Sequence, residues 1–290
     1  MTDYSIWMLE YAHCLTQPVS SIVYSQHNQG IRLLTFTYLV IKSREHIAMI
    51  DVGYDYADGG KTMADKFGVV DWQPPEVVLA KIGLKPEDID TIILTHAHFD
   101  HMGNLKAFPN AHFYLQRKEI SDWVWALSLP NKFGFISAAT NPDDITSAIQ
   151  LGAAGKMTLV DGETSSVLPG VRLIPMYDSH TFGSQLVVIE NDTPAGKDTW
   201  VVAGDNCYAY ENLLGVENSG VYLPVGFGVG SITNMTLALD KMMEIANGNI
   251  ERIIIGHEPK SFETYPSWQT ADGLHVAELR LAAGQRSLQP

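Results

Sequence analysis

The sequence predicts an α/β protein built from layers of strands and helices. Two observations favour this class over a helical bundle: short runs rich in β-branched residues recur in both halves of the chain, and segments with helical signals separate them. The 290 residues are 46% apolar and 18% charged, an ordinary globular composition. No linker rich in glycine, serine or proline divides the chain, so we expect one domain over residues 1–290.

In the first half of the chain, strands are expected over 33–41, 46–51, 91–94 and 112–115. Helical segments are expected over 76–82, 86–88 and 116–127. A short polar stretch separates the first two strands, which predicts a hairpin. Gly83 ends the first helix, and Pro86 with two acidic residues begins the helical turn. The segment 130–155 has neither pattern and is expected to be an irregular insertion or lid.

In the second half, strands are expected over 157–160, 171–175, 185–190, 200–203 and 252–255. Helices are expected over 234–246 and, near the C-terminus, over 269–283. Strands therefore dominate each half and helices flank them, which favours layers.

The strand at 91–94 leads directly into the segment 95–101, Thr-His-Ala-His-Phe-Asp-His. The spacing H-x-H-x-D-H arises by chance in about one such sequence per thousand. Imidazole nitrogens and carboxylate oxygens are the ligands that zinc takes in catalytic sites. Because a tight turn after a strand can direct alternate side chains toward two neighbouring ions, the segment predicts half of a dinuclear metal site.

Three further candidate ligands lie downstream in equivalent settings. His180, Asp205 and His257 each follow a predicted strand or its short extension. We therefore expect strand ends from both halves of the chain to meet at one cleft.

This set of residues resembles the metallo-β-lactamase superfamily over roughly residues 33–257. The resemblance implies a four-layered αβ/βα sandwich, with a metal site along the edge of two facing sheets. It implies that His96, His98 and His180 hold one divalent ion and that Asp100, His101 and His257 hold a second. Asp205 would bridge the two ions, for which zinc is the expected metal.

Three local matches are similar to the lactonases of this superfamily that open N-acyl homoserine lactones. They are Asp205-Asn206-Cys207-Tyr208 with Tyr210-Glu211-Asn212, Gln116-Arg117-Lys118-Glu119, and His180-Thr181-Phe182-Gly183-Ser184-Gln185. In the last, Phe182 and Ser184 replace a proline and a histidine. The resemblance implies a hydrolase that opens a lactone or related cyclic ester with a hydroxide bridging two metals. Tyr208 would stabilise the carbonyl oxygen, and Asp100 would pass a proton to the leaving alkoxide.

Other functions stay open for the same ligand set. The site could hydrolyse a cyclic amide or imide, or a thioester as glyoxalase II-like enzymes do. Those enzymes need basic residues for an anionic glutathione tail, and no basic cluster follows His257. A non-catalytic binding relative is disfavoured, because binding does not demand all seven ligand positions.

Several residues are expected to surround the ligands. Asp51, at the end of a predicted strand in Ile-Asp-Val-Gly, resembles an acidic residue that supports the site from behind the ligands. Candidates for a pocket that suits an apolar acyl chain or an aromatic ring are Trp123, Trp125, Phe133, Phe135 and Phe227.

The charge of the chain limits its partners. There are 33 acidic and 19 basic residues, a net charge of −14, which disfavours nucleic acid and anionic membrane surfaces. The longest apolar run is shorter than the roughly 20 residues that cross a bilayer, and the N-terminus lacks a signal-peptide pattern. Two cysteines require no oxidising compartment. We expect a cytoplasmic protein with a small-molecule substrate, and a homodimer is compatible with the sequence.

Overall fold

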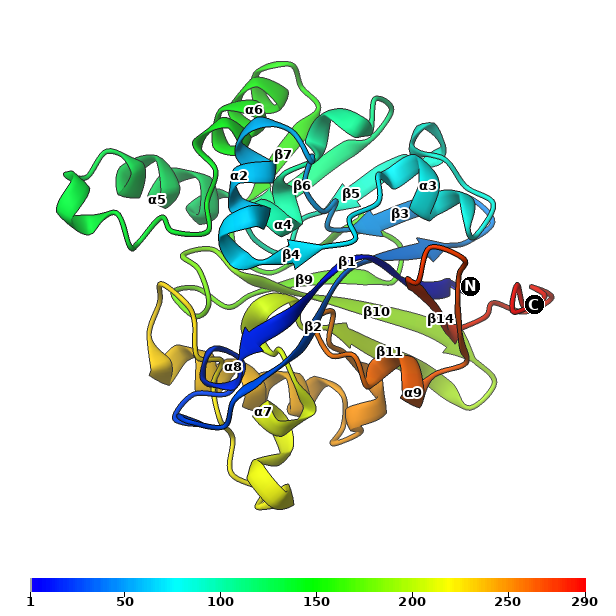
Figure 1. The fold of residues 1–290 in the computed structure, drawn as a ribbon. Helices are drawn as coiled ribbons and strands as arrows, with labels where there is room; N and C mark the ends of the chain where they lie inside the picture. The colour runs from blue at the N-terminus through cyan, green and yellow to red at the C-terminus, as the bar shows by residue number, and fades with distance from the viewer. Residues whose placement is uncertain (1) are drawn as a thin grey trace.

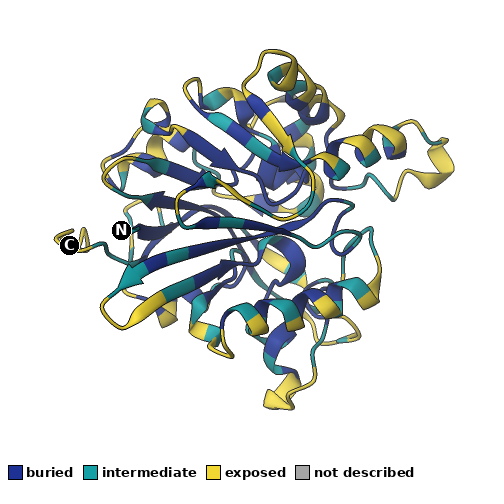
Figure 2. Ribbon diagram, turned by 180° about the vertical axis from the view of Figure 1, so that it is seen from behind, coloured by how far each residue is buried: buried dark blue, intermediate teal, exposed yellow. Residues whose placement is uncertain are grey.

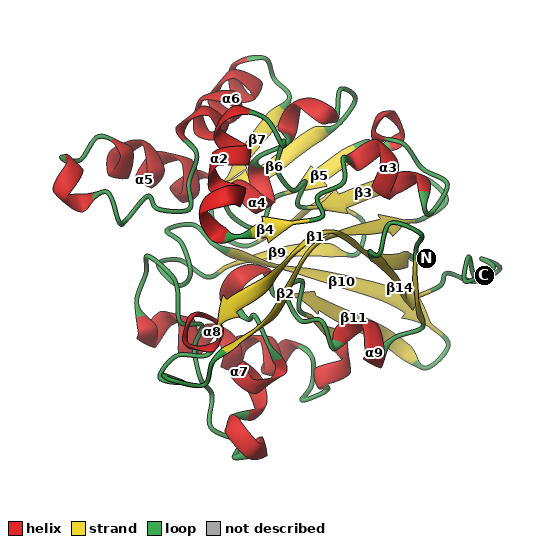
Figure 3. Ribbon diagram, in the orientation of Figure 1, coloured by secondary structure: helices red, strands yellow, loops and turns green. Residues whose placement is uncertain are grey.

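Two β-sheets face one another and carry helices on their outer faces in a computed structural model that describes residues 2–290 (Figure 1). Figure 3 shows the resulting order of layers, with helices above and below the paired sheets. This arrangement is the four-layered sandwich expected from the sequence. No helix among the described residues is long and apolar enough to cross a bilayer.

The larger sheet combines strands from the two ends of the chain. Its strands are β1 (Ser5–Pro18), β2 (Ile31–Lys42), β3 (Ile47–Ile50), β4 (Val69–Val70), β5 (Thr91–Ile93), β6 (His112–Gln116), β7 (Met157–Val160), β13 (Ser267–Gln269) and β14 (His275–Arg280). The order is β13-β14-β1-β2-β3-β5-β6-β7, with β4 pairing with β1. Neighbours from β13 to β3 are antiparallel, and those from β3 to β7 are parallel.

The smaller sheet comes from the second half of the chain. Its strands are β8 (Thr164–Leu168), β9 (Val171–Pro175), β10 (Gln185–Thr193), β11 (Gly196–Val202) and β12 (Ile253–Ile254). They lie in the order β12-β11-β10-β9-β8, and only β11 and β12 among these described strands pair in parallel. The parallel pair places the segments after β11 and β12 at the same edge of the sheet.

The helices cover the outer faces of the sheets. They are α1 (Val19–Ile22), α2 (Asp58–Phe67), α3 (Pro75–Ala80), α4 (Phe99–Met102), α5 (Arg117–Leu127), α6 (Pro142–Ala153), α7 (Tyr210–Leu214), α8 (Ile232–Ile245) and α9 (Ser261–Thr264). In α8, Leu239 and Met242 lie one turn apart and pack on the smaller sheet. Figure 1 shows α5 projecting from the body of the molecule.

Alternation along the strands separates the layers of the core. Met8 of β1 points between the two sheets, where it meets Val187 and Ile189 of β10. Trp7 and Leu9 point to the opposite face, beneath the helices. Successive strand residues face opposite sides of a sheet, so one apolar strand supplies two core layers. Figure 2 shows the strands largely buried and the helices exposed on their outer sides.

The helix predicted over 269–283 is wrong. That segment begins at the last residue of β13 and contains β14, which pairs antiparallel with β1. Val276 and Ala277 are fully buried, one in each core layer. Pairing with β1 therefore outweighs the local helical signals.

The irregular segment predicted over 130–155 is also wrong in its second part. Asn141 caps α6 by accepting a hydrogen bond from the backbone N–H of Asp143, and Pro142 takes the first helical position. Both are ordinary helix-start signals. The sequence patterns also did not indicate β1 and α2, whose positions become clear only from their packing.

Candidate metal centre

Seven buried histidine and aspartate side chains meet along one edge of the two facing sheets. They come from the turn after β5 (His96, His98, Asp100, His101), the β9–β10 loop (His180), and the turns after β11 (Asp205) and β12 (His257). Each is at most 7% exposed. All seven residues predicted from the sequence are therefore brought to one place.

The seven residues form two groups that share Asp205. The first group is His96, His98, His180 and Asp205, and the second group is Asp100, His101, His257 and Asp205. In each group the possible ligand atoms lie within 4.8 Å of one another.

Asp205 directs one carboxylate oxygen toward each group. Its Oδ2 lies 3.3 Å from Nε2 of His180 and 3.6 Å from Nε2 of His96. Its Oδ1 lies 3.0 Å from Nε2 of His101 and 3.1 Å from Nε2 of His257. This geometry would let the one carboxylate bind an ion in each group.

Several ligand atoms at the centre have no hydrogen-bond partner. Among the described residues these buried atoms are Nε2 of His96, His101 and His257 and Oδ1 of Asp205, whereas Nε2 of His180 faces Nδ1 of His98 at 3.0 Å. Buried polar atoms in proteins are almost always hydrogen-bonded, so this concentration of unpaired atoms needs an explanation. Lone pairs converging from two directions fit two divalent cations.

The pKa shifts of His96, His98 and Asp205 favour the charge state that metal binding requires. Burial, together with neighbouring imidazoles, lowers the pKa of His96 well below its ordinary value and that of His98 to about 3. These two rings therefore stay neutral. Burial opposes the charge of Asp205, but the imidazoles of His101 and His257 hold its pKa well below the ordinary value. Neutral imidazole and ionised carboxylate are the forms that bind metals. For His101 and His257 burial opposes a charge, but the carboxylates of Asp205 and Asp100 raise the pKa of both imidazoles.

Residues behind the ligands fix the orientation of the rings. Oδ2 of Asp51 lies 2.8 Å from Nδ1 of His101, and Asp51 also accepts hydrogen bonds from the backbone N–H and hydroxyl of Thr95. Nδ1 of His257 donates to the carbonyl of Thr35 at 2.6 Å. Both rings thus turn Nε2 toward Asp205. Asp51 occupies the position behind the ligands that its motif indicated.

Tyr208 also borders the centre. Its hydroxyl donates to Oδ2 of Asp205 at 2.8 Å. The side chain of Asn212 holds the local turn by accepting hydrogen bonds from the backbone N–H groups of Tyr208 and Ala209. The phenol is therefore fixed against the first group.

A cavity of about 150 Å³ opens onto both groups. The described residues that line it are Gln17, Ser21, Leu34, Phe36, Phe67, His98, Phe99, Asp100, Ala139, Asp205, Tyr208, Phe227 and His257. One end carries the metal ligands, and apolar and aromatic side chains form much of the remaining wall. Among these described residues there is no lysine or arginine to hold an anionic substrate.

The predicted pocket aromatics are only partly placed at this cavity. Phe227 lines it, but Trp123 is fully buried behind His98, with ring centroids 5.9 Å apart, and is absent from the described lining. Phe133 is 43% exposed and likewise outside the lining. Phe135 is 73% exposed and contacts Phe227, with ring centroids 6.1 Å apart. Trp123 was misplaced because its helical position faces the core.

Other lining residues were not found from the sequence. Phe99 lies inside the histidine motif itself, where its position next to Asp100 was the available signal. Gln17 and Ser21 belong to β1 and α1, which the sequence patterns did not reveal. Phe36 packs on the ring of His257, with centroids 5.0 Å apart.

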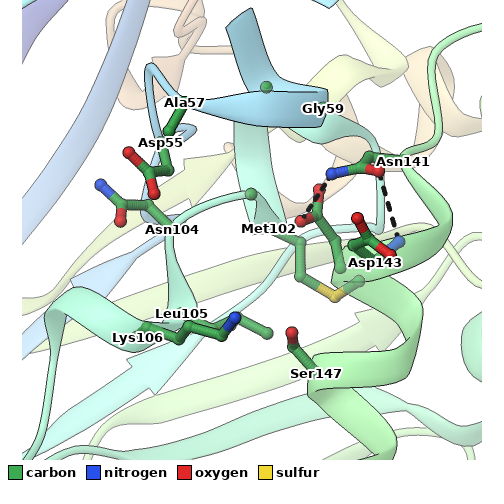
Figure 4. Close-up of a pocket in the computed structure, with 13 residues that line it drawn as sticks. Asp55, Ala57, Gly59, Met102, Asn104, Leu105, Lys106, Asn141, Asp143 and Ser147 are labelled. Carbon is green, nitrogen blue, oxygen red and sulfur yellow. Dashed lines mark hydrogen bonds between the residues drawn. The ribbon is translucent and has the colours of Figure 1, made fainter.

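A second cavity of about 100 Å³ lies among α2, α4 and α6 and is lined mainly by polar residues (Figure 4). Figure 4 shows Asp55 and Asn104 on one side and Asp143 and Ser147 on the other. The buried Asp144 also lines this cavity and accepts a hydrogen bond from Asn141. None of the seven candidate ligands is among the described lining residues, so this cavity is separate from the metal centre.

Comparison with known proteins agrees with this fold. Residues 30–257 match the metallo-beta-lactamase superfamily, and the chain belongs to that superfamily.

Relatives include a probable metallo-hydrolase of Methanocaldococcus jannaschii, 49% identical over 41 residues that are 14% of this chain and 20% of that protein. An N-acyl homoserine lactonase of a Bacillus species is 30% identical over 115 residues, 40% of this chain and 38% of the relative. The chain thus spans less than two thirds of the length of these relatives.

Solved structures are similar over nearly the whole chain. A quorum-quenching N-acyl homoserine lactone lactonase superposes with a TM-score of 0.64 at 20% identity, covering 91% of this chain and 96% of the other. A hydrolase of the beta-lactamase superfamily gives a TM-score of 0.66 at 19% identity, covering 97% and 96%. At these identities the likeness concerns the fold.

Proposed function

We propose that the protein is a metal-dependent hydrolase that opens a lactone or a related cyclic ester, with N-acyl homoserine lactones as the first substrates to test. The observation that carries this proposal is the pair of ligand groups joined by Asp205, with Tyr208 hydrogen-bonded to the same carboxylate. We propose zinc as the resident ion, held as two ions per chain.

Two divalent cations bound there would polarise a substrate carbonyl and lower the pKa of water toward neutrality. The residues of the chain supply the remaining functions. Tyr208 lines the cavity and offers its hydroxyl to the oxygen on which negative charge develops. Asp100 lines the same cavity, and the imidazole of His101 lowers its pKa against the effect of burial, so it is a carboxylate that can carry a proton to the leaving oxygen.

The cavity wall supports a neutral substrate with an apolar part. Leu34, Phe36, Phe67 and Phe227 lie on it, and the described lining contains no lysine or arginine. A glutathione thioester carries an anionic tail that such a wall does not stabilise. A lactone with an acyl chain buries its apolar part there instead.

A proton-release assay on the metal-loaded protein tests this proposal. The panel contains N-acyl homoserine lactones of several chain lengths, simple lactones, cyclic imides and thioesters. We expect the lactones to be hydrolysed fastest and His180→Ala, which removes a first-group ligand, to be inactive. Hydrolysis of thioesters alone would exclude the lactonase, and a wild-type protein that binds no transition metal would exclude the metal-dependent hydrolase.

A further inference from the structure

Glu119, in the first turn of α5, is a buried carboxylate that contacts two separate loops of the metal centre. Its Oε1 accepts hydrogen bonds from the backbone N–H of Ala97 and from Nε1 of Trp123, each at 2.8 Å. Its Oε2 accepts from the hydroxyl of Thr181 at 2.9 Å and from the backbone N–H of Gly183. The residue is 0% exposed, so water does not compete for these bonds.

The donors are placed next to the ligands of the first group. Ala97 lies between His96 and His98, and Thr181 directly follows His180. One carboxylate therefore joins the two chain segments that supply all three imidazoles of this group. An ionised carboxylate accepts hydrogen bonds on both oxygens, whereas an amide would present N–H groups to one pair of donors.

Close packing of Gly183 against α5 accompanies these bonds. A Cβ atom on Gly183 would overlap the backbone nitrogen of Glu119, so only glycine allows this approach. The hydroxyl oxygen of Ser184 accepts a hydrogen bond from the backbone N–H of Thr181 at 3.0 Å and so stabilises the same loop. The loop that carries His180 is thus built around the Glu119 carboxylate.

We propose that Glu119 is a positioning residue that sets the spacing of His180 from His96 and His98 and thereby the metal affinity of the first group. This rests on the metal-dependent hydrolase proposed above. The second group receives no hydrogen bond from Glu119 in the described contacts, and Asp51 and Thr35 support its rings instead. Loss of the carboxylate should therefore weaken one of the two metal sites selectively.

Competition between the purified protein and a chromophoric chelator for Zn²⁺ tests this selectivity. In Glu119→Gln, the dissociation constant of one of the two ions should rise about 10-fold, at the lower end of effects seen when partners behind metal ligands are removed. The other ion should keep its affinity. Excess Zn²⁺ should restore most of the turnover, because every ligand remains in place.

Glu10→Gln is the matched control. Glu10 is 1% exposed and accepts hydrogen bonds from His13 and His275, so it is also a buried glutamate with several partners. Its substitution should lower the free energy of unfolding without changing either zinc affinity. Equal zinc affinities in Glu119→Gln and wild type would overturn the proposal and leave Glu119 a residue of the core.

Thr181→Val gives a second test if Glu119→Gln fails to fold. The substitution removes one of the four donors and keeps the carboxylate, so a rise in the same dissociation constant of less than about 10-fold is expected. An unchanged affinity in this variant would also overturn the proposal. A wild-type protein that binds no zinc would instead overturn the proposed function, which separates the two failures.

Discussion

The hydroxyl of Tyr208 lies 2.8 Å from Oδ2 of Asp205 and donates a hydrogen bond to it. Burial raises the pKa of this phenol well above its ordinary value, and the Asp205 carboxylate raises it further. The hydroxyl therefore keeps its single proton, which it can donate to a substrate oxygen by turning away from Asp205. Tyr208→Phe should lower turnover roughly 10-fold to 1,000-fold, the range for losing one such donor.

Steady-state kinetics together with metal analysis checks this expectation. The metal content of Tyr208→Phe should equal that of wild type, since the phenol is not one of the candidate ligands. If turnover does not change, Tyr208 is a packing residue and another group stabilises the substrate oxygen.

Asp205→Asn tests the shared carboxylate. An asparagine keeps one acceptor oxygen and presents an amide N–H₂ to the other group, so it cannot serve both. We expect the variant to bind at least one metal ion fewer per chain than wild type. Its turnover should fall more than about 100-fold, which exceeds the usual effect of removing a residue that hydrogen-bonds to a metal ligand. Asp161→Asn, an exposed acid paired with Arg117, is the control and should behave as wild type. Two retained ions would rule out the bridging role.

Asp51→Asn tests the support of the second group. The amide oxygen can still accept a hydrogen bond from the backbone N–H of Thr95, but an N–H₂ group then replaces Oδ2, the acceptor that faces both Nδ1 of His101 and the Thr95 hydroxyl. The zinc affinity of the second group should fall about 10-fold to 100-fold. Zinc titration against a competing chelator measures this change. An affinity equal to wild type would show that the ring of His101 holds its orientation without Asp51.

Asp144 makes stability depend on pH. Burial raises the pKa of its carboxyl from 3.8 to about 7. A pKa raised by folding means that the folded state holds the proton more tightly, so stability is lost as pH rises from about 4 to about 7 and stays lower above that. Asp144→Asn should therefore be more stable than wild type at pH 8, by at most about 4 kcal/mol for a shift of this size.

Denaturant unfolding at several pH values measures this difference. The two proteins should have similar free energies of unfolding near pH 4 and should diverge toward pH 7. Asp143→Asn, at the exposed neighbouring position, should show a much smaller divergence. A constant difference at every pH would show that ionisation of Asp144 is not its cause.

Local patterns were sufficient for the ligands but not for what surrounds them. His96 to His101 form a dense motif after a strand, and His180, Asp205 and His257 each follow one, so their convergence follows from strand order. The residues that line the cavity could not be predicted in this way, because Phe36 and Phe67 have no motif around them and only packing places them beside the metal centre. Glu119 belongs to a short motif that signalled a relative but did not reveal its four partners.

Two predictions were wrong for the same reason: the helix over 269–283 and the placement of Trp123 in the pocket. The segment 275–280 is short and mixed in character, and it becomes a strand because β1 offers it an edge. Trp123 has an aromatic side chain of the kind that often lines pockets, but its position on α5 directs it into the core. Long-range pairing decides both outcomes, and a single sequence contains no direct record of it.

Strand β1 has a consequence for how the protein is made. It lies between β2 and β14, and Ile6 pairs with Arg280, so partners from opposite ends of the described chain must meet. During synthesis β2 is available early, whereas β14 emerges only after every candidate ligand. Until then β1 presents an apolar, unpaired edge to other nascent chains. Slow synthesis of the last segment should therefore promote aggregation, even though the metal-binding loops are already complete.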